Sequence, residues 1–163
     1  MKSYSEGGGI IGPGMHAPRF ALKDLEGNER SLDLVLEQGP VLLAFFKVSC
    51  PVCQLTFPFL ERLSRNEAIQ VIGITQDDAK STKVFNERFG VTFPVLIDPS
   101  REGYPVSNAF GISTVPTLFV TETDGTVSKS FAGFSKRDLE EIGKRMNVPP
   151  FHRDEHVPEF KAG

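Results

Sequence analysis

Cys50 and Cys53 are the only two cysteines among the 163 residues, and two residues separate them. A disulfide that closes so short a loop removes little entropy from the unfolded chain, so a structural crosslink is a poor explanation for the pair. Two thiols at this spacing suit reversible thiol–disulfide exchange. We therefore interpret Cys50 and Cys53 as a redox-active site.

The residue between the cysteines that matters most is Pro51, because it predicts where a helix begins. A residue before proline is pushed out of helical conformation, and proline itself suits the first helical position. Cys50 is then the predicted N-cap, and the backbone N–H groups of Val52 and Cys53 point toward its sulfur and favour its thiolate. We expect Cys50 to be the nucleophile and Cys53, one turn into the helix, to be the shielded resolving thiol.

The elements around this helix follow from the hydrophobic pattern. Val41–Phe46 is a continuous apolar run, typical of a central strand that is buried on both faces. A hairpin is predicted within 18–34, with a short helical turn after it. Further strands are predicted at 69–74, 93–98, 117–120 and 127–131, and further helices at 80–89, 105–110 and after Ser135. This order predicts an α/β fold with a mixed central sheet and helices on both faces.

Composition narrows the class of partner. A hydrophobic fraction of 39% and 14 Phe are enough for one well-buried core. The net charge of −3 gives no basic footprint, so we expect no nucleic-acid or membrane partner. No apolar window approaches the roughly 20 residues that span a bilayer. We expect one domain at 16–148, a flexible glycine-rich arm at 1–15 and a proline-rich, charged, solvated tail at 149–163.

The cellular location is expected from the first residues. The segment 1–9 has a single Lys and no apolar run of signal-peptide length, which favours the cytoplasm. If a signal was removed from a precursor, the alternative is a periplasmic or other extracytoplasmic compartment, where a CxxC pair also works.

Several segments together resemble the redoxin branch of the thioredoxin superfamily, which includes alkyl hydroperoxide reductase and thiol-specific antioxidant proteins. The likeness spans 15–146 and is greatest to bacterial thiol–disulfide reductases. The segments are Ala17–Phe20, Leu25–Gly27, Phe45–Cys53, Phe93–Val95 and Val115–Thr117. The resemblance implies a three-layer thioredoxin-like fold with an N-terminal hairpin extension. It also implies a monomeric disulfide oxidoreductase without a cofactor, which takes a protein or small-molecule disulfide and is recharged by an upstream dithiol donor.

The resemblance also implies a substrate-binding surface. Val115–Pro116 would be a cis peptide facing the cysteine pair, with the Val115 backbone pairing to an extended substrate. Thr114, Val115 and Pro116 are therefore candidate substrate-binding residues, together with Pro51 and Val52. An ordinary trans proline at the start of an edge strand is the alternative reading of Pro116. Pro58 matches the proline that kinks the helix after the resolving cysteine.

The chain departs from the family pattern beside the cysteines. Ser49 stands where thioredoxins have Trp, and Ala44 stands where they have a buried acid. Thr56 replaces the Glu that the reductases often carry three residues after the second cysteine. The proton acceptor for Cys53 is therefore not identified by the sequence. Lys47 is a candidate for placing positive charge near the Cys50 thiolate, although a lysine at a strand end more often reaches solvent.

Four other readings compete with disulfide exchange. A peroxiredoxin-like peroxidase is the nearest, but Lys47 and Leu43 stand where those enzymes have Thr and Pro. A zinc half-site lacks a second pair of cysteines, so we expect no metal. A thioredoxin-fold metallochaperone would need a distant histidine, and the chain offers His16, His152 and His156, all outside the predicted core. A redox-inactive binding module would not need both thiols at the productive spacing.

Overall fold

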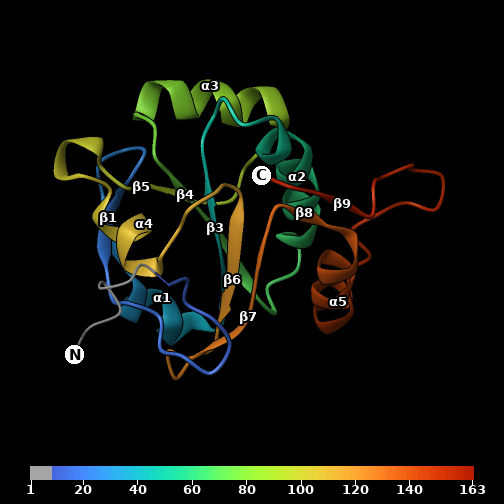
Figure 1. The fold of residues 1–163 in the computed structure, drawn as a ribbon, viewed down its shortest axis with the longest axis horizontal. Helices are drawn as coiled ribbons and strands as arrows, with labels where there is room; N and C mark the ends of the chain where they lie inside the picture. The colour runs from blue at the N-terminus through green and yellow to red at the C-terminus, as the bar shows by residue number, and fades with distance from the viewer. Residues whose placement is uncertain (1–8) are drawn as a thin grey trace.

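The computed structural model describes residues 9–163, and it has a seven-stranded mixed sheet at its centre (Figure 1). The strand order is β2-β1-β5-β4-β3-β6-β7. A separate pair, β8-β9, lies beside it. The strands of the main sheet are β1 (Ala21–Asp24), β2 (Glu29–Ser31), β3 (Val41–Phe46), β4 (Gln70–Thr75), β5 (Val95–Ile97), β6 (Thr117–Thr121) and β7 (Val127–Ala132), and the pair is β8 (Phe134–Ser135) and β9 (Phe160–Lys161).

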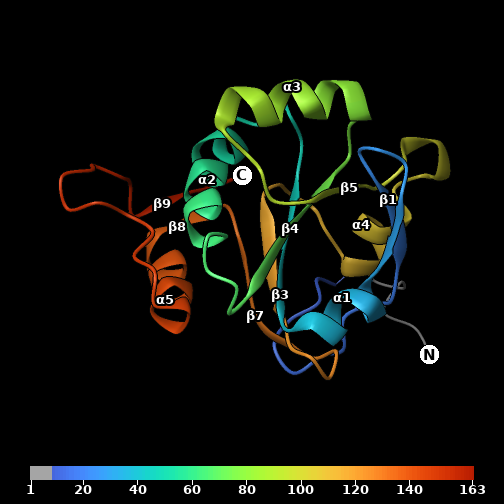
Figure 2. The same cartoon turned by 180° about the vertical axis from the view of Figure 1, so that it is seen from behind.

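Helices cover both faces of the sheet, so the predicted α/β class and thioredoxin-like layering are confirmed (Figures 1 and 2). The predicted hairpin forms as β1 and β2, and the predicted helix after Cys50 forms as α2. The helices are α1 (Leu32–Gln38), α2 (Pro51–Leu63), α3 (Ala79–Phe89), α4 (Pro105–Phe110) and α5 (Lys136–Met146), with a short 3-10 turn at Ser100–Glu102.

The central strand β3 supplies side chains to two separate cores. Successive strand residues point to opposite faces, and all six residues of β3 are buried. One core, to which α2, α3 and α5 contribute, contains the β3 residues Leu42, Ala44 and Phe46. The other, to which α1 and α4 contribute, contains Val41, Leu43 and Phe45. Burial on both faces is the reason that this strand reads as an unbroken apolar run.

The neighbours of β3 determine what meets at its carboxyl end. β4 runs parallel to β3, whereas β6 runs antiparallel with Phe45 opposite Thr117. The residues that follow β3 therefore lie beside the residues that precede β6. The sheet in this way brings the Cys50 loop, the end of β4 and Pro116 to one edge.

Both ends of the described chain pack on the core. Ile11 is 1% exposed, and its backbone N–H donates to the Phe110 carbonyl. At the other end β9 pairs with β8, and Arg62 of α2 binds Glu155. The prolines led us to expect a solvated tail, and most of its residues are indeed exposed, but long-range contacts hold it against the core. The divisions at residues 15 and 148 stay predictions, and residues 1–8 of the expected arm lie outside the described residues.

We predict that Phe57→Ala destabilises the fold by about 3–5 kcal/mol, because a large buried side chain leaves a cavity. Phe57 is fully buried in α2, with its ring 4.2 Å from that of Phe46 and 5.6 Å from that of Phe85, centroid to centroid. Urea unfolding followed by circular dichroism measures the change. Val84→Ala on α3, at a side chain 66% exposed, is the control and changes stability by less than about 0.5 kcal/mol. Equal midpoints for both variants would contradict this account of the core.

Candidate functional site

Cys50 is the N-cap of α2, as the sequence predicted. Its backbone is extended, with φ −82° and ψ 115°, and Pro51 occupies the first helical position. The Cys53 backbone N–H donates to the Cys50 sulfur at 3.1 Å. This donor and the positive end of the helix dipole both face the sulfur, so the start of α2 offers stabilisation to negative charge that develops there during exchange.

The two thiols differ sharply in exposure. Both cysteines are free, Cys50 is half-buried and Cys53 is fully buried. Burial raises the pKa of the Cys53 thiol, and a hydrogen bond with Cys50 raises it further. The negative charge of Asp77 also raises this pKa. Cys53 is therefore held as a neutral thiol, while Cys50 is the sulfur that a partner molecule can reach.

The loop before β6 faces the Cys50 sulfur. The Val115–Pro116 peptide bond is cis, as the resemblance implied, and the Cys50 thiol donates to the Val115 carbonyl at 3.4 Å. Thr114 is exposed, and its carbonyl accepts a 2.7 Å hydrogen bond from the Thr117 hydroxyl. This hydrogen bond ties the loop to the first residue of β6. The structure therefore brings Thr114–Pro116 and the cysteine pair together.

Backbone hydrogen bonds shape the turn between β3 and α2. The Cys50 N–H donates to the Lys47 carbonyl at 3.2 Å, and the Gln54 amide donates to the Val48 carbonyl at 2.9 Å. The Lys47 residue is exposed, which fits a side chain that reaches solvent. The turn thus depends on the backbone of Lys47 and on the side chain of Gln54.

Asp77 is a site residue that the sequence did not single out. Its carboxylate accepts the Val48 backbone N–H at 2.8 Å, and its own N–H donates to the Thr75 hydroxyl. Asp77 follows β4, whose carboxyl end lies beside that of β3 because the two strands are parallel. An acid just after a strand predicted to neighbour the cysteine-bearing strand was the signal available in the sequence.

The two positions where related proteins carry an acid hold buried residues without a charge in this chain. Ala44 is fully buried in β3, and Thr56 is fully buried in α2. The Thr56 hydroxyl donates to the Val52 carbonyl at 2.7 Å, so its polar group is satisfied within the helix. Asp77 is the carboxylate whose charge acts on Cys53 in place of an acid at either position.

The three histidines lie apart from the cysteine pair. His16 forms an isolated bridge with Thr126, at the hairpin end of β6 opposite to Pro116. His152 and His156 belong to the tail, where the His152 N–H donates to Glu155. Within residues 9–163, no group of three or more His, Cys, Asp or Glu side chains is placed to hold a metal ion. Within the same residues, no helix is long and apolar enough to cross a bilayer.

The AhpC/TSA family model matches residues 13–130. The chain is 32% identical over 136 residues to the thiol-disulfide oxidoreductase ResA of Geobacillus thermodenitrificans, covering 80% of this chain and 76% of the relative.

Two solved structures share the fold. The thioredoxin domain of thiol-disulfide oxidoreductase BVU-2223 from Bacteroides vulgatus has a TM-score of 0.73 at 20% identity, covering 84% of this chain and 99% of its own. A secreted disulfide oxidoreductase of Mycobacterium tuberculosis has a TM-score of 0.63 at 22% identity, and the match covers 78% of this chain and 94% of its own.

We predict that Asp77→Asn makes Cys53 more reactive. In a Cys50→Ser background, iodoacetamide should label Cys53 slowly between pH 6 and 9, because burial, the largest cause of its raised pKa, does not depend on Cys50. Asparagine keeps an acceptor for Val48 but removes a negative charge, so the pKa of Cys53 falls and labelling at pH 8 becomes at least about twofold faster. Mass spectrometry after timed labelling measures the rate.

Glu87→Gln is the matched control, because Glu87 is an exposed acid on α3. It should leave the labelling rate of Cys53 unchanged. If iodoacetamide labels Cys53 at the same rate in the Asp77→Asn and Glu87→Gln variants, Asp77 has no electrostatic influence on the buried thiol.

Proposed function

The chain belongs to the AhpC/TSA family and is a thiol–disulfide oxidoreductase, and we propose that it works as a reductase in which Cys50 is the nucleophile and Cys53 the resolving thiol. The observation that carries this assignment is the 3.1 Å contact between the Cys53 N–H and the Cys50 sulfur at the start of α2. That contact places a backbone donor and the positive end of α2 against the sulfur of the more exposed cysteine, where negative charge develops during disulfide exchange.

In the first step the Cys50 thiolate attacks one sulfur of a substrate disulfide. A bond forms between Cys50 and that sulfur, the substrate disulfide breaks, and the other substrate sulfur leaves as a thiolate that takes up a proton. The product is a mixed disulfide between Cys50 and the substrate. The half-buried position of Cys50 supports this step, because the attacking sulfur must meet the substrate in line with the bond that breaks.

In the second step Cys53 loses its proton and attacks the Cys50 sulfur of the mixed disulfide. The second substrate sulfur leaves as a thiolate and takes up a proton from water, which balances the proton that Cys53 released. The protein ends with a Cys50–Cys53 disulfide, oxidised by two electrons. The first step has already converted Cys50 into a bonded sulfur, and this removes a hydrogen bond that raises the pKa of Cys53. Asp77 is the positioning residue for this step through the Val48 backbone.

Protein disulfides are the substrates that the family relationship implies. The residues that contact the substrate and the donor that reduces the enzyme are part of the proposal. Thr114, Val115 and Pro116 bind an extended substrate on one side of Cys50, while Pro51 and Val52 contact it on the other. An upstream dithiol donor reduces the Cys50–Cys53 disulfide and restores the enzyme. One chain is sufficient, because a single protomer supplies both cysteines and the cis-proline loop.

The working compartment in this proposal lies outside the cytoplasm, in contrast to the cytoplasmic location favoured by residues 1–9. The support comes from the Mycobacterium tuberculosis relative, which is a secreted disulfide oxidoreductase. We predict that fractionation of the native cells recovers the protein outside the cytoplasmic fraction, as an immunoblot with a cytoplasmic marker protein would show. Recovery together with that marker would restore the cytoplasmic expectation.

Cysteine variants test the roles. Cys50→Ser should lose insulin-disulfide reduction and form no mixed disulfide, whereas Cys53→Ser should lose turnover but accumulate mixed disulfides with substrate. Non-reducing electrophoresis and mass spectrometry measure the trapped species. Ser49→Ala, next to the pair, is the control and should keep turnover. Turnover by Cys50→Ser with none by Cys53→Ser would reverse the assignment.

Two further measurements on the parent protein complete this test. A reduction potential more negative than that of the glutathione couple fits a reductase, whereas a potential well above it would make the chain an oxidant. Peroxide consumption separates the peroxidase alternative. With an added thiol present to reduce the sulfenic acid, rapid peroxide turnover that survives Cys53→Ser would favour that alternative, because formation of the sulfenic acid does not need Cys53.

A further inference from the structure

The segment Glu159–Gly163, here called the covering segment, runs as a strand along β8. Phe134 is paired with Lys161 and Ser135 with Phe160, both antiparallel. The Lys136 N–H also donates to the Glu159 carbonyl at 3.0 Å. Figure 1 shows β9 leading along β8 toward the edge where α2 begins. The covering segment is therefore held by backbone pairing and directed toward the cysteine site.

The covering segment ends against the carbonyl that faces Cys50. A methyl group added at Gly163 would lie 2.1 Å from the Val115 carbonyl oxygen and 2.8 Å from its carbon. The same oxygen accepts the hydrogen bond from the Cys50 thiol. Gly163 thus packs directly on the backbone of the cis-proline loop. The Val115 carbonyl is the group that Gly163 and the Cys50 sulfur both contact.

Gly133 joins the covering segment to the same loop. Its N–H donates to the Pro116 carbonyl at 2.8 Å, and its backbone has a φ of +78°. A side chain at Gly133 would collide with the Lys161 carbonyl oxygen, since a Cβ built there lies 2.3 Å away. Only a residue without a side chain allows this approach. Lys161 therefore lies against Gly133, which is hydrogen-bonded to Pro116, while Gly163 lies against Val115 itself.

The rest of the tail anchors the covering segment to the core. Arg62 of α2 makes a bidentate ion pair with Glu155, with both N–O distances 2.6 Å, and it also donates to the Pro150 carbonyl. Hydrogen bonds from Arg62 and from the His152 N–H lower the pKa of Glu155 to about 2, so the pair is ionised at neutral pH. The Phe151 ring lies 4.8 Å from that of Phe59.

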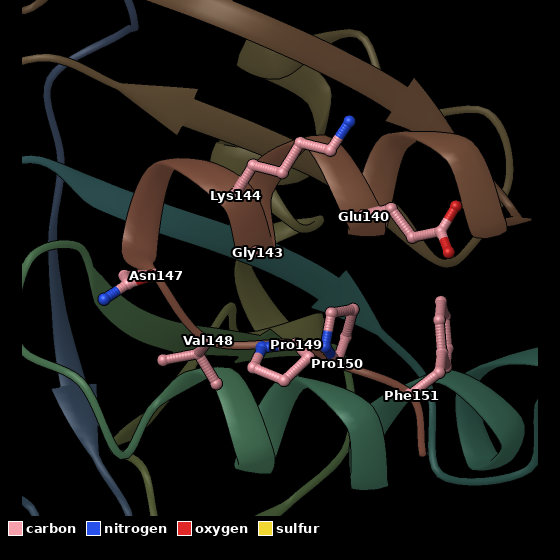
Figure 3. A pocket seen from close by; sticks show the side chains of 8 residues that line it. All are labelled: Glu140, Gly143, Lys144, Asn147, Val148, Pro149, Pro150 and Phe151. Carbon is pink, nitrogen blue, oxygen red and sulfur yellow. The ribbon is translucent and has the colours of Figure 1, made fainter. Parts of the chain in front are cut away.

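Figure 3 shows the first part of this tail, which lines a pocket with the end of α5. Val148, Pro149, Pro150 and Phe151 pass between α5 and α2. The tail is thereby wedged between two helices before it reaches the cysteine edge. A packed stretch of chain therefore precedes the covering segment and fixes where it begins.

We propose that the covering segment occupies the place where the backbone of an extended substrate would pair with Val115, so that a substrate polypeptide must displace it. This inference rests on the proposed function. The segment is held mainly through its backbone, and the Phe160 side chain is 57% exposed, so the contact tolerates many sequences. The substrate class is therefore an unfolded or extended polypeptide that contains a disulfide. A small-molecule disulfide needs no strand pairing at Val115 and reacts whether the segment is bound or displaced.

Point variants of the 163-residue chain give the first test. Gly163→Ala introduces the collision with the Val115 carbonyl, and Lys161→Pro removes a backbone donor from the β8–β9 pair. Both should raise kcat/KM for a disulfide-containing unfolded polypeptide by at least about threefold, because the open fraction of the protein rises. Lys161→Ala keeps the backbone N–H and is the matched control, with kcat/KM close to that of the parent.

The same variants should reduce the small aromatic disulfide 5,5′-dithiobis(2-nitrobenzoate) at the rate of the parent. Equal kcat/KM for the polypeptide in the parent, Gly163→Ala and Lys161→Pro would overturn the proposal. An equal acceleration with both kinds of disulfide would also overturn it, because the segment would then shield Cys50 itself rather than the pairing surface.

A binding measurement keeps this test independent of turnover. A labelled synthetic peptide of residues 157–163 should bind a variant that ends at residue 158 but not the 163-residue chain, as fluorescence anisotropy would show. If neither protein reduces disulfides, the proposed function fails, while selective peptide binding still supports the covering segment. Failure of the peptide to bind the shortened variant, with its fold verified by circular dichroism, would overturn the proposal.

Discussion

The hydrogen bond from the Cys53 backbone N–H to the Cys50 sulfur is the interaction around which the site is arranged. It exists because α2 begins at Pro51, immediately after the turn that follows β3. One helix start therefore sets two properties at once. It turns Cys50 toward the loop that contains Val115, and it buries Cys53 within the first turn, where a charged sulfur is disfavoured.

The rigidity of that helix start comes from the two cores. β3 is buried on both faces, and its alternate side chains pack in opposite cores. A shift of the strand register by one residue would therefore place every side chain in the wrong core. Parallel β4 and antiparallel β6 then fix what lies beside the carboxyl end of β3. The position of Asp77 and of Pro116 near the cysteines is a consequence of strand order rather than of local sequence.

The difference between local sequence signals and contacts set by strand order explains which features the sequence could predict. Pro51 and the run Val41–Phe46 are local signals, and the helix, the central strand and the cap at Cys50 follow from them. Asp77 was missed because its contact with Val48 joins residues 29 positions apart. The packing of the tail was missed for the same reason, since Arg62 and Glu155 are 93 positions apart. Prolines there indicated irregular backbone correctly, but irregular backbone can still be packed.

The Arg62–Glu155 ion pair also has a consequence for selectivity. Because it fixes the chain only a few residues before the covering segment, that segment competes as a tethered ligand, whose effective concentration is on the order of millimolar for short linkers. A chance encounter with a folded protein surface cannot match that concentration through weak contacts. Under the proposed displacement, a flexible chain that offers a long run of backbone can compete, so the tethered segment would favour disulfides in unfolded chains over disulfides in native proteins.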